Sequence, residues 1–293
     1  MKSLLICVVL LELVWFGNGQ SGDDHHPLAP AFFVFGDSLV DSGNNNYIPT
    51  LARANYFPYG IDFGFPTGRF CNGRTVVDYG ATYLGLPLVP PYLSPLSIGQ
   101  NSLRGVNYAS AAAGILDETG QHYGARTTFN GQISQFEITI ELHLRRFFQN
   151  PADLRKYLAK SIIGINIGSN DYINNYLMPE RYSTSQTYKT IELRCKKNGV
   201  SWVRTIRLHT KSAIYVLLSA GLVVSNEACC RNGRYGGALT CLPLQQPCLD
   251  RQQYVFWDAF HPTETANKII AHNTFSKSAN YSYPISVYEL AKL

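Results

Sequence analysis

The sequence predicts an α/β fold in which helices cover a parallel, doubly wound sheet. A short apolar and aromatic run over 31–35 ends at Gly36, which is typical of a buried strand. A second apolar run over 161–167 also ends at a glycine, and polar residues follow it. Helical patterns lie between and after these runs, and such alternation of strands with helices indicates a parallel sheet.

The region between the two predicted strands contains a long loop and a helix. Residues 49–74 are rich in Gly, Pro and aromatics without a helical period, which predicts an ordered surface loop. A run of small apolar residues over 106–114 ends in Gly114. Apolar residues then recur at helical spacing over 132–149, which predicts an amphipathic helix that Pro151 stops.

The C-terminal part continues the same alternation. A short strand is predicted over 254–257, followed by a helix over 263–275 with Pro262 at its first position. Asp258 and His261 lie on the loop between them. Sites in doubly wound sheets gather beyond the carboxyl ends of the strands, so we expect functional side chains at this loop and after the other strands.

The N-terminus has the features of a secretory signal peptide. Residues 1–19 contain Lys2, an apolar run broken only by Glu12, and small residues up to Gly19. The run is shorter than the roughly 20 apolar residues that span a membrane, so no integral span is predicted. We interpret 20–293 as a single domain. Cleavage removes one basic and one acidic residue, and the remaining net charge of +5 does not indicate nucleic-acid binding.

Six cysteines remain after the predicted cleavage: Cys71, Cys195, Cys229, Cys230, Cys241 and Cys248. An even set in an oxidising compartment predicts disulfides, although the sequence leaves their pairing open. Zinc is not favoured, because the chain has neither a CxxC pair nor a nearby pair of histidines. We predict that Cys71 and at least two of the last four are oxidised. Asn280 begins the only glycosylation sequon.

The polar residues at the predicted strand ends suit a nucleophilic serine. A serine hydroxyl reacts well only when a base takes its proton, and a carboxylate improves that base by fixing its tautomer. Ser38 follows the first strand, and Asp258 with His261 supplies such a base on one short loop. The backbone N–H groups of Ser38 and Gly114 and the side-chain amide of Asn170 are candidate oxyanion donors, since each follows an apolar run.

Simpler interpretations apply to most polar residues. Gly-Asp-Ser alone is a common turn, and Asp-x-x-His often just begins a helix. Asp37, Asp41 and Asp171 are interpreted as carboxylates that fix turns and loops, because nothing singles out the facing pair that a glycosidase needs. The remaining histidines are interpreted as surface or satisfied residues: His25, His26, His122, His143, His209 and His272.

Five blocks of the sequence carry a family resemblance: FGDSLVDSGNNN (35–46), PTGRFCNGRT (66–75), VNYASAAAGI (106–115), IGSNDY (167–172) and FWDAFHPT (256–263). They resemble the signature blocks of the plant GDSL esterase/lipases of the SGNH hydrolase superfamily. By position, the resemblance implies Ser38 as nucleophile, His261 as base, Asp258 as its orienting carboxylate, and Gly114 with Asn170 in the oxyanion hole. It also implies a flavodoxin-like three-layer α/β/α fold and ester hydrolysis outside the cell or in the cell wall, without metal or cofactor.

The resemblance fails over 190–218. The stretch 189–218 contains seven Lys or Arg against Glu192 alone, and we interpret it as foreign to the fold rather than as a polyanion site. Only 88 positions separate Asn170 from Asp258, which is short by roughly two strand–helix units of about 30 residues each. The apolar segment 213–224 is a candidate replacement strand.

Three functional hypotheses follow. The first is a secreted carboxylic-ester hydrolase whose substrate is a lipid, a cutin-like polyester or an acylated sugar. The second is a catalytically impaired or non-enzymatic relative, poorly secreted because its middle segment is shortened. The third is a module that binds a cell-wall polymer through the aromatic residues of the long loop: Tyr56, Phe57, Tyr59, Phe63 and Phe65.

Overall fold

The computed structural model describes residues 26–176, 207–208, 217, 220–237, 239–279, 282–283 and 285–293. The predicted signal peptide, the glycosylation sequon at Asn280 and Cys195 therefore lie outside the described residues, as does most of the off-pattern segment 190–218.

Short strands alternate with helices along the described chain. The strands are β1 (Phe32–Gly36), β2 (Ile162–Asn166), β3 (Arg207–Leu208), β4 (Val224–Ala228), β5 (Tyr254–Phe256) and β6 (Ser282–Tyr283). The helices are α1 (Val76–Tyr83), α2 (Phe129–Ile138), α3 (Pro151–Lys160), α4 (Ser169–Asp171), α7 (Glu264–Phe275) and α8 (Val287–Lys292).

β1 lies inside a small parallel sheet. It pairs with β2 so that Phe32 lies opposite Ile162. On its other edge, the Val34 N–H donates to Val106 O at 3.0 Å and Val34 O accepts the Tyr108 N–H at 2.7 Å. β1 is therefore hydrogen-bonded along both edges, which agrees with its fully buried, apolar sequence.

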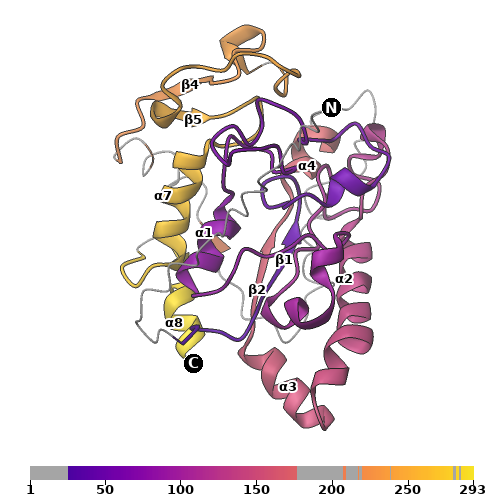
Figure 1. Cartoon of the computed structure of the whole chain (residues 1–293). Helices are drawn as coiled ribbons and strands as arrows, with labels where there is room; N and C mark the ends of the chain where they lie inside the picture. The colour runs from indigo at the N-terminus through magenta and orange to yellow at the C-terminus, as the bar shows by residue number, and fades with distance from the viewer. Residues whose placement is uncertain are drawn as a thin grey trace, which may run out of the picture.

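Helices cover both faces of this sheet, as Figure 1 shows. Alternate residues of a strand point to opposite faces, so Phe32 and Val34 pack in one core with α1, α7 and α8. Phe33 and Phe35 pack in a second core with α2 and α3 on the other side. The predicted α/β class, with a parallel sheet between two helical layers, is confirmed.

The helices differ from the predictions at their ends. The predicted helix over 132–149 begins earlier, as α2, and continues as one π-helical turn (Thr139–Leu144) and one 3-10 turn (Arg145–Phe147). Pro151 does more than stop this helix, because it opens α3, whose N-cap Asn150 accepts the next two backbone N–H groups. Pro262 precedes the N-cap of α7 instead of occupying its first turn.

The sheet is divided in the described part of the chain. β4 and β5 form a separate parallel pair, and no described strand hydrogen-bonds to the second edge of β2. Ile165 of β2 is 45% exposed, whereas an interior parallel strand is normally covered on both faces. Six of the twelve residues of the candidate replacement strand, 213–224, are described. Among these six, Leu217 is helical, 220 and 221 form a turn, and only Val224 belongs to a strand, β4, so the predicted strand is not found there. The predicted fold is thus present in a partly incomplete form.

Candidate active site

The carboxyl end of β1 is held by hydrogen bonds from α2. The buried Gln132 side chain accepts the Gly36 N–H at 2.8 Å and donates to Gly36 O at 2.8 Å. A Cβ on Gly36 would lie 2.2 Å from Asn166 O of β2, so this close approach requires glycine. The next N–H, of Asp37, donates to Asn166 O at 3.1 Å. Ser38 therefore follows a strand end that is fixed from two sides.

The half-buried Ser38 meets the loop that follows β5. The Ser38 Oγ lies 2.7 Å from His261 Nε2. On the other side of the imidazole, Nδ1 lies 2.7 Å from Asp258 Oδ1 and 2.9 Å from Oδ2. Asp258 Oδ1 also accepts the backbone N–H of His261 at 2.9 Å. Both loop residues are buried, so the short turn holds a carboxylate and an imidazole in line with the serine hydroxyl.

The Asp258 carboxylate has a further partner that sequence reasoning missed. The buried Tyr59 hydroxyl donates to Asp258 Oδ2 at 2.5 Å and accepts the Cys241 N–H at 3.2 Å. Burial alone would raise the pKa of Asp258, but His261 and the hydrogen bonds from His261, Tyr59 and a backbone N–H lower that pKa below its usual value. Burial and the neighbouring carboxylate raise the pKa of Tyr59, which keeps it a proton donor.

Tyr59 belongs to the aromatic loop of the polymer-binding hypothesis. Its side chain is fully buried, so it does not offer a surface to a polymer, whereas Phe57 and Phe65 are exposed. Nothing in the local sequence pattern reveals the Tyr59 contact, because Asp258 lies 199 residues further along the chain. Only the path of the loop brings the two side chains together.

The imidazole also contacts the same long loop. The Phe70 ring lies against the His261 ring with centroids 4.9 Å apart and planes at 34°. Phe70 in turn packs edge-on against Tyr59 at 5.8 Å. The long loop predicted over 49–74 thus contacts both His261, through Phe70, and Asp258, through Tyr59.

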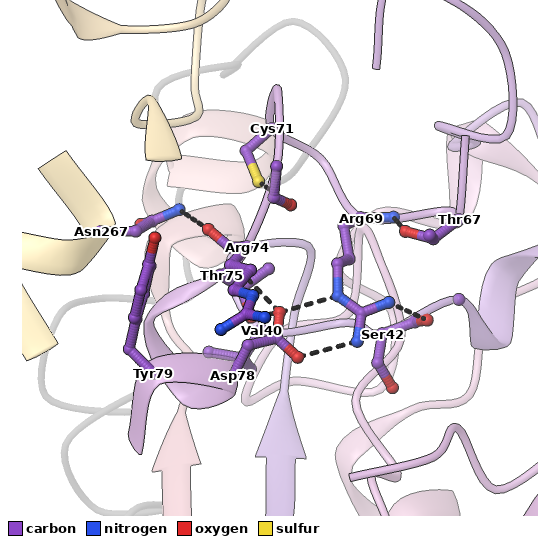
Figure 2. Close-up of polar contacts among 12 residues, drawn as sticks. Val40, Ser42, Thr67, Arg69, Cys71, Arg74, Thr75, Asp78, Tyr79 and Asn267 are labelled. Carbon is purple, nitrogen blue, oxygen red and sulfur yellow. Dashed lines mark hydrogen bonds and ion pairs between the residues drawn. The ribbon is translucent and has the colours of Figure 1, made fainter. Parts of the chain in front are cut away.

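An ion pair next to Phe70 fixes this loop, as Figure 2 shows. Arg69 donates from Nε to Asp78 Oδ2 and from Nη2 to Asp78 Oδ1, each at 2.7 Å, and both side chains are buried. Arg69 also reaches the Ser42 carbonyl at 3.3 Å. Thr75 donates its N–H and its hydroxyl to the same carboxylate and caps α1. The segment that carries Phe70 is therefore tied to α1 and to the turn after Ser38.

The start of α7 is tied to the same segment. Asn267 donates its side-chain amide to Arg74 O at 3.0 Å, a contact that is also drawn in Figure 2. Glu264 accepts the Arg74 N–H at 3.1 Å and the Tyr79 hydroxyl at 3.0 Å. Because α7 begins three residues after His261, these bonds limit the movement of the loop that carries the imidazole.

The two other predicted site residues lie together at neighbouring turns. The Asn170 side-chain amide donates to Ala113 O at 2.9 Å, directly before Gly114. Asn174 donates to Asn170 Oδ1 at 2.6 Å, which fixes the orientation of the amide. A Cβ on Gly114 would lie 2.7 Å from Asp171 Oδ1, so the two turns are in close contact.

The three acidic residues interpreted as structural do hold backbone turns. Asp41 accepts the N–H groups of residues 43 and 44 at 2.7 Å each. Asp171 accepts those of residues 115 and 116 at 2.8 and 3.1 Å. Asp37 accepts the N–H of residue 39 at 3.1 Å, and burial raises its pKa to about 7. No group of three or more His, Cys, Asp or Glu in the described residues is arranged to hold a metal ion.

Four cysteines form two disulfides beside the site. Cys229 pairs with Cys248, and Cys230 pairs with Cys241, whose N–H reaches Tyr59. The expectation that Cys71 is oxidised is not met, because Cys71 is a buried free thiol that donates to a backbone carbonyl two residues away at 2.9 Å. The short disulfide loops hold a segment that has few strands or helices of its own.

Replacing Tyr59 with Phe is expected to lower kcat on a short acyl ester by about tenfold and to leave KM nearly unchanged. The variant keeps the ring but removes the donor to Asp258, and a tenfold loss corresponds to about 1.4 kcal/mol of transition-state stabilisation. Steady-state kinetics measures the effect. Tyr56→Phe is the control, because the Tyr56 hydroxyl donates to Cys241 O. Equal losses in both variants would leave Tyr59 with a structural role alone.

The arrangement of Ser38, His261 and Asp258 matches the geometry with which serine hydrolases activate a hydroxyl. Sequence comparison agrees with that class. The profile of the family described as GDSL-like Lipase/Acylhydrolase matches residues 32–215. The Arabidopsis thaliana protein GDSL esterase/lipase 7 is 71% identical over 365 residues, with 100% of each chain covered. GDSL esterase/lipase At4g18970 of the same plant is 38% identical, with 98% of this chain and 99% of the relative covered. The chain therefore belongs to the GDSL-like lipase/acylhydrolase family, a family of carboxylic-ester hydrolases.

The comparison also bears on the length of the chain. The alignment with GDSL esterase/lipase 7 spans 365 positions, whereas this chain has 293 residues. At least 72 aligned positions (365 less 293) therefore have no residue of this chain opposite them. A deficit of this size agrees with the shortfall of about two strand–helix units that the spacing of the motifs predicts.

Proposed function

We propose that the chain hydrolyses carboxylic esters, with Ser38 as nucleophile and the pair of His261 and Asp258 as its base. The observation that carries this proposal is the 2.7 Å contact between Ser38 Oγ and His261 Nε2. Ser38 Oγ attacks the acyl carbonyl carbon while His261 takes its proton and passes it to the leaving alcohol. Water then attacks the acyl-serine, His261 accepts the water proton and returns it to Ser38, and the acid leaves. Asp258 stays ionised and holds the imidazole in one tautomer.

The proposed oxyanion donors are the backbone N–H groups of Ser38 and Gly114 and the side-chain amide of Asn170. A primary amide has two N–H donors, and the contact with Ala113 O uses one of them. The second N–H is available to an oxyanion.

Replacing Asn170 with Ala is expected to lower kcat on a short acyl ester by about 10²–10³, the usual effect of removing one oxyanion donor. Steady-state turnover of the purified protein measures it. Asn101→Ala is the matched control, because this exposed amide donates to a nearby carbonyl, Leu96 O at 3.1 Å. An unchanged kcat in Asn170→Ala would remove the residue from the site.

A fluorophosphonate probe tests the proposal as a whole. We expect it to label Ser38 in the folded protein, because only a serine activated by its base reacts rapidly with this electrophile. Peptide mapping after labelling identifies the residue, with the Ser38→Ala variant and the denatured protein as negative controls. Labelling of another serine, or no labelling of a cooperatively folded protein, would contradict the assignment.

We further propose that the protein is secreted, through the signal peptide at 1–19, as a single domain over 20–293 that acts outside the cell or in the cell wall. The two disulfides support an oxidising compartment. Across the described ranges, no helix combines the length and apolar character that crossing a membrane requires. The proposed substrates are lipid or acyl esters, including cutin-like polyesters and acylated sugars.

A second candidate function is that of an impaired family member. The uncovered second edge of β2 among the described strands and the deficit of at least 72 aligned positions favour it. Ser38, His261 and Asp258 lie in contact in spite of that deficit, so the two candidates differ in stability and yield more than in the chemistry proposed for the site. For the polymer-binding hypothesis, the aromatic loop offers exposed rings such as Phe57 and Phe65, because Tyr59 is buried.

A further inference from the structure

The segment closed by the two disulfides exposes apolar side chains to water. Leu244 is 82% exposed and Leu249 is 95% exposed, and Leu239 and Leu242 are also exposed. Single exposed leucines are common on protein surfaces, but here four lie within eleven residues, three of them inside the cross-linked loop and Leu249 directly after Cys248, and they form a concentrated apolar surface.

This surface adjoins the candidate active site. The Leu244 N–H donates to Phe57 O at 2.8 Å, and Leu239 O accepts the Ala259 N–H at 3.3 Å. Ala259 lies between Asp258 and Phe260, and both phenylalanines are exposed. We name this set the apolar rim: Phe57, Leu239, Leu242, Leu244, Leu249 and Phe260. Figure 1 shows that the β4 segment, which leads into this loop, lies at one end of the molecule above β5.

The charge of the loop has one sign. Between Cys229 and Leu249 the only charged residues are Arg231 and Arg234, both exposed. The Arg234 guanidinium lies 4.8 Å above the ring of the exposed Tyr235 and donates to its hydroxyl at 2.9 Å. This combination suits an anionic lipid surface. Leucines can enter the acyl region, a tyrosine favours the interface, and arginines bind the phosphate groups of the lipid heads.

The backbone of the loop supports the same interpretation. Four non-glycine residues in the described chain have positive φ, and three of them are Arg231, Tyr235 and Leu244. Such conformations cost free energy and persist where the surroundings impose them, and they gather at functional sites. Here they occur at one arginine, at one tyrosine and at the most exposed leucine between the paired cysteines.

We infer that the apolar rim docks the protein on an anionic lipid surface, with Arg231 and Arg234 at the headgroups, and so brings acyl esters to Ser38. Docking itself does not require turnover. Only its link to hydrolysis rests on the proposed function.

The test uses the Ser38→Ala full chain, which binds without turnover, and sedimentation with two kinds of vesicle. One contains phosphatidylcholine alone, and the other contains phosphatidylcholine with phosphatidylglycerol. We expect binding to the mixed vesicles, weakened by salt, and a loss of about tenfold or more in Leu242→Asp/Leu244→Asp. Arg231→Gln/Arg234→Gln is expected to reduce binding to the mixed vesicles toward the level of phosphatidylcholine alone.

Leu142→Asp is the matched control, because Leu142 is 66% exposed on the turn after α2, on the side of the sheet opposite α7. It should bind vesicles as the parent does. Melting curves verify folding, and Leu249→Asp replaces the double variant if that variant does not fold. Absence of vesicle binding, unchanged binding in the rim variants, or an equal loss in Leu142→Asp would overturn the inference. Fluorophosphonate labelling of Ser38 in the unsubstituted chain shows separately whether the proposed function stands.

Discussion

Replacing His261 with Ala is expected to lower kcat on a short acyl ester by about 10⁴–10⁶, the range typical of losing the base of a serine hydrolase. The imidazole is the group whose Nε2 lies 2.7 Å from the Ser38 hydroxyl. Without it no described group stands ready to take that proton. Pre-steady-state and steady-state kinetics on the purified variant measure the loss, and fluorophosphonate labelling of Ser38 should fall in parallel.

His272→Ala is the control for this experiment. His272 lies on α7, after the loop that carries His261, and its Nδ1 is 2.9 Å from the Tyr83 hydroxyl at an exposed position. Its removal should leave kcat unchanged. Activity that survives the loss of His261 would show that another base serves Ser38, and the assignment of both loop residues would then fall.

Restoring the middle segment is expected to have the largest effect on stability and secreted yield. In this variant, residues 190–218 are replaced by the segment that joins the same motifs in GDSL esterase/lipase 7. A strand added beside β2 would cover roughly 400 Å² of apolar surface, and at about 25 cal/mol per Å² this contributes about 10 kcal/mol. The whole stability of a domain is only about 5–15 kcal/mol. We therefore expect higher yield, a more cooperative melt and higher turnover.

The restored chain with Ser38→Ala separates these effects, since it should gain yield and cooperativity without turnover. Equal yield, a sharp melt and full activity in the unmodified chain would show that its middle is a tolerated variation. In that case the uncovered edge of β2 would carry little energetic penalty, and the impaired-relative hypothesis would be wrong.

The strands nearest the site could be predicted closely from the sequence. β1 and β2 lie within one residue of the predicted runs, because each is a short apolar stretch that a glycine turn ends. The pairing of Asp258 with His261 was also predictable, since three residues on one loop bring them together. Helix ends were less predictable, because Asn150 makes Pro151 a helix start and not only a stop.

The supporting residues of the site could not be predicted in the same way. Tyr59 and Phe70 act through contacts with residues that are almost two hundred positions distant in the chain. Their positions depend on the path of a loop without periodic pattern, which the Arg69 ion pair and the Cys230–Cys241 disulfide fix. Composition marks such a loop as ordered or aromatic, but it does not give the direction in which each ring points.

The edge of β2 that no described strand pairs with has a consequence for the chain in concentrated solution. Its sequence, Ile-Ile-Gly-Ile-Asn, has no charge, and nothing in the described structure occupies the backbone groups on that side. An uncharged edge of β-branched residues is a template on which another extended chain can add. Self-association through β2 would remove protein from solution at a rate that rises with concentration, so newly made chains would be most vulnerable where they are crowded. Natural sheets discourage such pairing by placing charged residues, especially lysine, on their edge strands. Ile165→Lys would add such a charge at an exposed position of β2.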